Sequence, residues 1–199
     1  MLRTSHFAAL ALLIATPLAG CVSLGSEPPP QLLTLTANEQ RAPGTDTQAM
    51  PLDALIVEVP STNSIIDQTR IPVQIDDSAV AYVKDAVWAD KPARLFRGVM
   101  AETIAAQTGK LVLDRSEVGV SGGTVLDGEL SRFGYDKALG AVVVRFDATL
   151  RKAGQAIRKR RFEAKVPVYK VEARPVAAAL NQASNTVAQE VSQWVAQPK

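Results

Sequence analysis

The sequence predicts an α+β fold, a two-layer sandwich in which two amphipathic helices lie on one face of an antiparallel-rich mixed sheet. Residues 141–151 alternate apolar and polar side chains, which is typical of a strand with one face in water, and residues 124–133 and 156–166 predict strands before and after it in an antiparallel meander. Residues 92–108 and 175–196 repeat apolar side chains at steps of three and four, which is typical of helices that bury one side. The apolar sides of the helices and of the sheet therefore cover each other.

The clearest strand covers residues 141–151. Side chains of a strand point to opposite faces in turn, so the apolar residues here share one face and the polar residues share the other. The predicted buried face comprises Val142, Val144, Phe146, Ala148 and Leu150, and the exposed face comprises Arg145, Asp147, Thr149 and Arg151. Residues 152–155 predict the turn to the next antiparallel strand.

Both predicted helices have recognisable ends. Asp90 can accept hydrogen bonds from the first free amide groups, and Pro92 fits the first turn, where no amide donor is needed. Gly109 favours the left-handed conformation that ends a helix. The second helix runs from about Pro175 to Ala196. Its apolar stripe comprises Val176, Leu180, Ala183, Val187, Val191 and Trp194.

The first half of the chain predicts shorter strands and one long polar loop. Residues 54–59 form a compact β-rich run that suits a central strand. Pro72 cannot donate to a strand ladder, so we expect its strand at a sheet edge or at a strand start. The remaining strands are expected at residues 32–36, 70–75, 79–83 and 111–113, and the loop at residues 38–53.

The N-terminus has the pattern of a bacterial lipoprotein signal peptide. Arg3 precedes an apolar run over residues 7–19, and the only cysteine of the chain, Cys21, follows Leu-Ala-Gly. This order resembles the lipobox, where the peptide is cut before the cysteine and the thiol is acylated. We expect residues 1–20 to be removed and Cys21 to carry the acyl chains, palmitate among them. The alternative is an ordinary secreted protein with a chance cysteine.

The rest of the chain divides into a tether and one domain. Residues 21–31 contain three consecutive prolines and predict an extended spacer, and residues 32–199 have the length of a single α+β domain. In lipoproteins of this kind, aspartate directly after the cysteine favours retention at the inner membrane, whereas here that residue is Val22. We therefore expect the protein at the periplasmic face of the outer membrane rather than at the inner membrane.

Composition argues against several functions. His6 is the only histidine and lies in the predicted signal peptide, so the mature chain lacks imidazole for a Ser-His-Asp triad or for a His/Cys zinc site. No glycine-rich phosphate loop followed by Lys-Ser/Thr is present, which argues against ATP hydrolysis. We expect no enzyme, no cofactor and no metal. A formal net charge of +2 gives no electrostatic signal for nucleic acid.

Carboxylate pairs are the remaining candidates for catalysis. Asp76 and Asp77 are adjacent, which favours a role in forming a turn. Asp127 and Glu129 share one face of a predicted strand, and an exposed polar face explains both. A carboxylate-only hydrolase is thus the weaker interpretation of these residues.

The strongest concentration of charge is the basic run Arg158, Lys159, Arg160 and Arg161. Strand alternation places Arg158 and Arg160 on one face and Lys159 and Arg161 on the other. One interpretation is an exposed or edge strand, in which charge opposes edge-to-edge pairing. The sharper interpretation is contact with anionic lipid head groups or with an acidic partner surface.

Several segments follow the lipobox and tether in a fixed order: Arg70-Ile71, Tyr82, then Trp88-Ala89-Asp90-Lys91-Pro92, and the segment Leu126-Asp127-Gly128-Glu129-Leu130-Ser131-Arg132-Phe133. In this order they resemble the ABC-type transport auxiliary lipoprotein family. The resemblance covers roughly residues 32–195, and the stretch from Tyr82 to the first helix is its most specific part. Lys91 departs from the pattern, where a small residue is commoner, and this affects only the helix entry.

The resemblance implies an α+β domain without enzymatic activity in an envelope lipid-transport system. Its partners would be an MCE-domain protein and an ABC permease with its ATPase. It would act as a docking adaptor. Assembly into a homo-oligomer is compatible with this role. Two alternatives stay open at this point. One is a structural or assembly lipoprotein of another envelope machine. The other is a lipid carrier with its own internal cavity.

Overall fold

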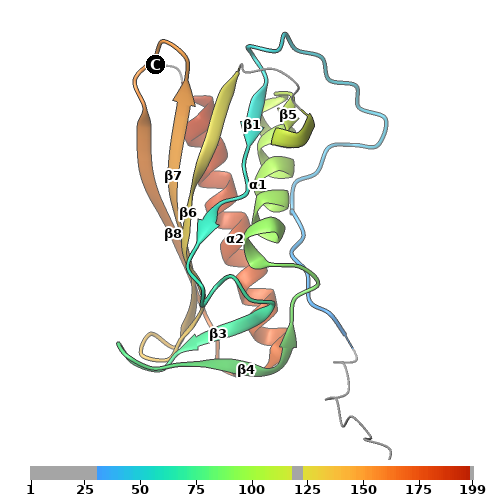
Figure 1. Ribbon diagram of the computed structural model, residues 1–199. Helices are drawn as coiled ribbons and strands as arrows, with labels where there is room; N and C mark the ends of the chain where they lie inside the picture. Colours follow the sequence, from blue (N-terminus) through green and yellow to red (C-terminus); the bar gives the residue numbers. More distant parts are fainter. Residues whose placement is uncertain (1–30, 118–122, 198–199) are drawn as a thin grey trace, which may run out of the picture.

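In the computed structural model, which describes residues 31–117 and 123–197, the chain forms the predicted α+β sandwich (Figure 1). A mixed sheet of eight strands carries both helices on one face. The helices are α1 (Pro92–Thr108) and α2 (Ala173–Ala196). The strands are β1 (Leu55–Val57), β2 (Ser61–Thr62), β3 (Arg70–Gln74), β4 (Val80–Val87), β5 (Val112–Leu113), β6 (Thr124–Asp136), β7 (Ala141–Lys152) and β8 (Arg158–Pro167). The predicted signal peptide, Cys21 and the tether up to residue 30 lie outside the described residues.

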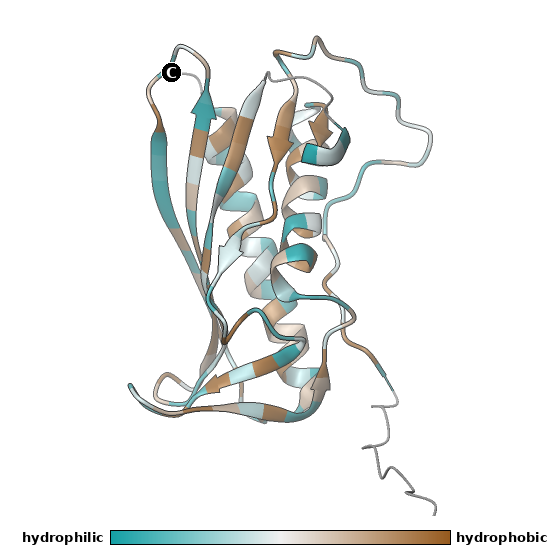
Figure 2. Ribbon diagram, in the orientation of Figure 1, coloured by the Kyte–Doolittle hydropathy of each residue, from teal (hydrophilic) through white to brown (hydrophobic). Residues whose placement is uncertain are grey.

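The predicted antiparallel meander is formed by β6, β7 and β8. Leu126 pairs with Leu150, and Phe146 pairs with Phe162, so apolar residues face each other across the strands. The predicted faces of β7 are confirmed, because its even-numbered residues from 142 to 150 are buried beneath the helices. Figure 2 shows the alternation of apolar and polar residues along these strands.

A β-bulge in β6 keeps its apolar side chains on one face. The register with β7 shifts between Leu130 and Arg132. Even-numbered Leu126 and Leu130 are buried before the shift, and odd-numbered Phe133 and Tyr135 are buried after it. One extra residue therefore reverses the alternation, and the whole strand still contributes to a single core.

The core lies between the sheet and the two helices. Three aromatic pairs connect its parts, with ring centroids 5.5–5.8 Å apart, a spacing that favours tilted and edge-to-face contacts. The pairs are Trp88–Phe133, Phe96–Phe146 and Phe162–Trp194. Since α1 packs on β1 and β5 and α2 packs on β7 and β8, the helices leave the opposite face of the meander uncovered.

Two features of the ends of α1 are as the sequence predicts, and one is not. Pro92 occupies the first helical turn, and Gly109 adopts φ 65° and ends the helix, with its amide donating a hydrogen bond to the Ala105 carbonyl. Asp90 is not the N-cap residue as predicted. The ring of a proline clashes with the preceding residue and disfavours the helical conformation there. The helix therefore begins at Pro92, and Lys91 is the N-cap residue. The Asp90 carboxylate accepts a hydrogen bond from the Lys91 amide at 2.7 Å.

Two predictions for the first half of the chain are wrong. Residues 32–36 form no strand, and only an isolated bridge joins Leu33 to Trp88. The strand with Pro72 is not at an edge, because β3 lies between β4 and β6. It tolerates the proline because its register with β4 shifts between Arg70 and Pro72, and because pairing with β6 begins only at Val73.

Residues 31–41, which we call the strap, lie across both helices. On α2, the Asn181 carboxamide accepts a hydrogen bond from the Thr36 amide at 2.8 Å. The Asn185 carboxamide accepts one from the Asn38 amide at 2.7 Å and donates one to the Thr36 carbonyl at 2.9 Å. The strap is thus held largely through its backbone, by asparagine side chains that act as strand partners.

Replacement of Asn185 by alanine is expected to release the strap. The Asn185 side chain is almost fully buried, and each hydrogen bond of this kind contributes about 1 kcal/mol. Amide hydrogen exchange at residues 36 and 38 should accelerate, while exchange in β7 stays unchanged. Thr186→Ala is the matched control, because the exposed Thr186 hydroxyl bonds only to its own helix. Equal exchange at residues 36 and 38 in both variants would contradict this account of the strap.

Candidate interaction surface on the open face of the sheet

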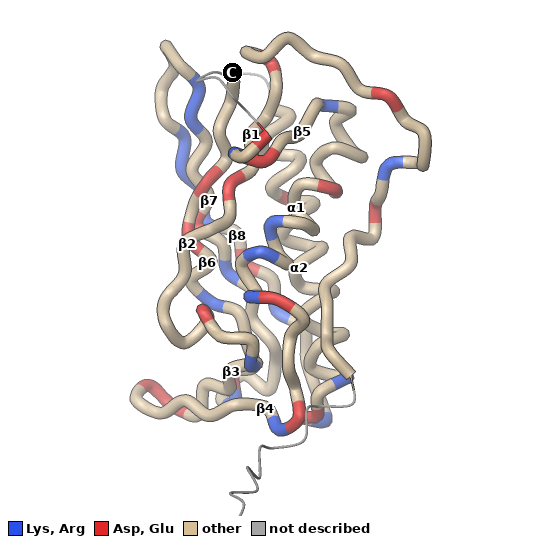
Figure 3. The backbone as a smooth tube through the Cα atoms, turned by 45° about the vertical axis from the view of Figure 1, so that its right-hand side comes forward, with Lys and Arg blue, Asp and Glu red and all other residues tan. Residues whose placement is uncertain are grey.

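The candidate surface is the face of β6, β7 and β8 that points away from the helices, which we call the open face. Cross-strand neighbours form charged rows there, and Figure 3 shows basic and acidic residues side by side along these strands. One row consists of Glu129, Asp147 and Arg161. A second row consists of Asp127, Thr149 and Lys159. The open face is therefore polar but not of one charge.

Most charges on the open face are paired within the sheet. Arg161 donates to Asp147 at 2.6 Å, and Ser131 donates to the other oxygen of the same carboxylate at 2.9 Å. Arg145 donates to Glu163 at 2.5 Å. Asp127 receives a hydrogen bond from Arg151. Pairs of this kind across partly exposed strands contribute little to stability individually, but they fix the side chains that a partner would meet.

Strand β8 divides the basic run between two faces, with the alternation that the sequence predicts. The Arg158 guanidinium lies 4.8 Å from the ring centre of Trp194 and donates to the Trp194 carbonyl at 3.3 Å. Arg160 lies 5.1 Å from the ring centre of Phe162. These two arginines therefore stack on the edge of the core beside α2.

Lys159 differs from its neighbours. It is exposed on the open face, and no ion pair among residues 31–117 and 123–197 includes it. It borders a shallow hollow of about 420 Å³. The other residues that line this hollow are Glu58, Val59, Ser61, Asp127, Gly128, Glu129, Asp147 and Thr149. Lys159 is thus a charged group on this surface that remains available to a partner.

The ion pairs of the open face alter the acidity of its carboxyl groups. The hydrogen bond from Arg161 lowers the pKa of Asp147, and the bond from Ser131 adds to this effect. Burial alone would raise the pKa of Glu163, but hydrogen bonds from Lys165 and Arg145 outweigh it and lower that pKa. Both carboxylates are therefore ionised at neutral pH, and the face keeps its charge pattern.

The lowered pKa of Asp147 predicts a pH dependence of stability. Because its folded-state pKa lies below its unfolded value, its contribution is complete above about pH 4 and is lost as the pH falls through the folded pKa. Asp147→Asn should flatten the acid side of the plot of unfolding free energy against pH, measured by chemical denaturation. Arg161→Gln should flatten it too, since it removes the largest cause of the shift. Wild-type acid dependence in both variants would contradict this assignment.

The basic run and the start of the strap lie at opposite ends of the domain. Gln31 accepts a hydrogen bond from Arg174 at 2.6 Å, in the first turn of α2, whereas Arg158 contacts Trp194 in the last turn. Twenty residues of α-helix separate Arg174 from Trp194, which corresponds to about 30 Å at 1.5 Å per residue. Figure 1 shows the strap starting at the end opposite the C-terminus.

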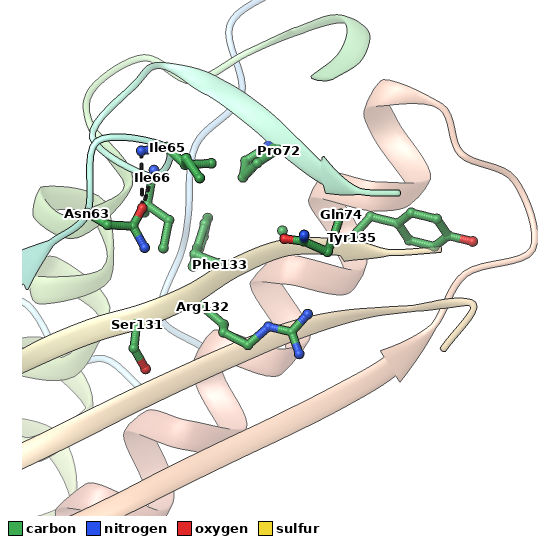
Figure 4. Close-up of a pocket in the computed structure, with 10 residues that line it drawn as sticks. Asn63, Ile65, Ile66, Pro72, Gln74, Ser131, Arg132, Phe133 and Tyr135 are labelled. Carbon is green, nitrogen blue, oxygen red and sulfur yellow. Dashed lines mark hydrogen bonds between the residues drawn. The ribbon is translucent and has the colours of Figure 1, made fainter. Parts of the chain in front are cut away.

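A small pocket lies between β6 and the segment that connects β2 to β3 (Figure 4). Its volume is about 70 Å³, and its lining includes Ile65, Ile66, Pro72 and Phe133. Ligand pockets usually measure roughly 300–1,000 Å³, so this one is too small for a lipid. It gives no support to the interpretation of the domain as a lipid carrier.

In each carboxylate pair considered for catalysis, one member has a structural role. Asp76 forms a turn, in which its side chain accepts hydrogen bonds from Ser78 and from the Ala79 amide. The hydrogen bonds from Ser78 lower the pKa of Asp76. Asp127 is bound by Arg151. Among the described residues, no group of three His, Cys, Asp or Glu side chains could hold a metal ion.

Sequence analysis missed the side chains that hold the strap. Asn181 and Asn185 lie four residues apart on α2, outside its apolar stripe, and Asn185 is nevertheless buried. An asparagine in the interior of a helix is unfavourable unless its side chain has a partner, so these two positions indicated a contact with another segment.

Neither helix of the described part is apolar over enough of its length to cross a bilayer.

Two crystal structures have the same fold. A protein from Xanthomonas campestris is 23% identical, with a TM-score of 0.66, and the match covers 83% of this chain and 94% of that one. An uncharacterized protein is 17% identical, with a TM-score of 0.64, and the match covers 76% of this chain and 97% of that one. No curated protein sequence matches the chain significantly. The model of the ABC-type transport auxiliary lipoprotein component matches residues 33–192, and the chain therefore belongs to that family.

Proposed function

We propose that this protein is a lipid-anchored, non-catalytic adaptor at the periplasmic face of the outer membrane. In this role it docks an MCE-type lipid-transport system, with its ABC permease and ATPase, to the membrane that holds Cys21. The family membership supports a role as an auxiliary component of ABC-type transport. Energy for transport would come from the partner ATPase.

The observation that carries the proposal is the separation of two features along α2. The chain leaves the domain toward the tether beside Arg174, and the basic run starts beside Trp194 at the other end. An anchor at one end and a charged surface about 30 Å away suit a protein that spans the gap between a membrane and a partner.

This geometry also favours an acidic partner surface, rather than lipid head groups, as the contact of the basic run. Head groups of the anchoring membrane would lie at the end of the domain where the strap begins, whereas Lys159 lies near the opposite end on the open face. We therefore assign Lys159 to contact with an acidic surface of a transport component, with Arg161, paired with Asp147, beside it on the same face. Arg158 and Arg160, stacked on Trp194 and Phe162, would support the edge of that surface.

Charge reversal at Lys159 tests this docking surface. Lys159→Glu should cause a severalfold loss of the MCE-type component captured with the tagged lipoprotein from solubilised host membranes. The substitution replaces an unpaired positive charge with a negative charge, which repels the acidic surface of the partner. Lys165→Glu is the matched control, since Lys165 is exposed on the same face of β8, six residues further along. Capture at the wild-type level with Lys159→Glu would place docking elsewhere on the protein.

A further inference from the structure

Exposed apolar side chains gather at the end of the domain where the strap begins. Tyr169 is 98% exposed, and Leu32, Leu139 and Val171 are between 46% and 60% exposed. These residues come from three separate segments: the start of the strap, the turn between β6 and β7, and the connection from β8 to α2. Exposed apolar residues that meet from separate segments indicate a contact surface rather than isolated surface positions.

Hydrogen bonds join these segments into one end of the molecule. The Val168 amide donates to the Gly140 carbonyl at 3.0 Å, which places the connection before α2 against the turn between β6 and β7. The bond from Arg174 to Gln31 places the start of the strap against the first turn of α2. We call this surface the strap end.

Tyr169 is the prominent side chain of the strap end. It borders a hollow of about 350 Å³ together with Pro167, Val168, Lys170 and Pro175. Tyrosine has an apolar ring and a polar hydroxyl, and it is enriched where a protein meets the interface between lipid and water. A fully exposed tyrosine beside prolines and a lysine stem has the chemistry of such an interfacial contact.

The length of the tether brings this surface to a membrane. Ten residues, from Cys21 to Pro30, precede Gln31. Even fully extended, they span at most about 36 Å. The strap fixes the chain from Gln31 onward against the helices, so a tether anchored at Cys21 enters the domain at the strap end and brings that end within reach of the bilayer.

We propose that the strap end rests in the head-group region of the bilayer that holds Cys21, with Tyr169 as its main interfacial contact. This inference rests on the proposed lipid anchor and adds an orientation to it. The occupant of the surface is the lipid bilayer, because the anchor brings it within reach. Lys137, Lys170 and Arg174 are balanced at this end by Asp76, Asp77 and Glu172, so the contact does not require anionic lipid.

An upright orientation follows from this contact. With the strap end on the membrane, α2 points away from it and Lys159 lies about 30 Å further into the periplasm. The open face is then presented to a partner beyond the membrane surface. The contact at Tyr169 would keep the domain from tumbling about its tether.

Tryptophan fluorescence in vesicles tests the proposal. Tyr169→Trp is compared with Ile157→Trp, in which a 65% exposed apolar residue at the opposite end of the domain is replaced. Each full-length lipidated protein is reconstituted into vesicles of phosphatidylethanolamine and phosphatidylglycerol, with and without brominated lipid. Trp88 and Trp194 are buried and give the same background in both variants. We expect a loss of emission in brominated vesicles for Tyr169→Trp and none for Ile157→Trp.

Three results would overturn the proposal, and they differ in what else they affect. If the protein does not float with vesicles, the lipid anchor itself fails. If it floats but brominated lipid quenches both variants equally, the anchor stands and the orientation is wrong. If the emission of Tyr169→Trp shifts to the blue without quenching, a protein surface covers the strap end instead of lipid.

Discussion

Val144→Asp is expected to abolish the folded domain. Val144 is fully buried in the centre of β7, between β6 and β8, under the helices. A carboxylate there has no partner, and its burial costs several kcal/mol whether it stays charged or takes up a proton. Because the whole domain is stable by only about 5–15 kcal/mol, we expect no cooperative unfolding transition by circular dichroism.

Arg145→Gln is the control for this change. Arg145 is the next residue on the same strand, lies on the open face and bonds to Glu163. Loss of one partly exposed ion pair should lower the unfolding free energy by less than about 1 kcal/mol. If both variants unfold at the same denaturant concentration, the faces of β7 are assigned wrongly.

Gly128→Ala should produce the second large effect. Gly128 has φ 152°, and a Cβ atom there would lie 2.2 Å from the Asp147 carbonyl oxygen and 2.8 Å from the Phe146 ring. Backbone strain and forced displacement of a neighbouring strand cost roughly 2–6 kcal/mol together. Thermal and denaturant unfolding should both report this loss of stability.

Gly98→Ala is the matched control, and it should raise the unfolding free energy instead of lowering it. Gly98 is exposed in α1, and no atom lies within 4 Å of the position that its Cβ would occupy. Alanine in a helix interior is favoured over glycine by about 1 kcal/mol. Equal destabilisation by the two exchanges would show that the close approach at Gly128 does not limit stability.

The sequence was most informative where one period persists over many residues. The alternation in β7 predicted the buried side chains at the even-numbered positions from Val142 to Leu150, but not the burial of Val143 on the other face. The stripe of α2 predicted the helix within two residues at its start and at the right residue at its end. In both elements the local pattern and the burial point to the same structure, so no tertiary information was needed.

Elements that depend on distant partners were not predictable. The run at residues 32–36 has strand character, but its backbone hydrogen bonds are divided between one bridge at Leu33 and the side chains of Asn181 and Asn185 on α2. The bulge at Ser131 reverses the alternation in β6 without a local sequence signal. The position of β3 inside the sheet also depends on pairing with β6, some 60 residues later.

The candidate surface was predicted in part. Alternation correctly divided the basic run between two faces of β8. Lys159 and Arg161 differ in the residue opposite them on β7. Asp147 lies opposite Arg161 and can pair with it, whereas the uncharged Thr149 lies opposite Lys159. Cross-strand register decides that difference, and a single strand does not encode it.

The central claim is that the adaptor is tied to a membrane through Cys21, and mass spectrometry of the protein isolated from its native host tests it most directly. We expect a mature N-terminal peptide that begins at Cys21 and carries the mass of acyl chains. A peptide that retains residues before Cys21, or one with an unmodified thiol at that position, would contradict the account.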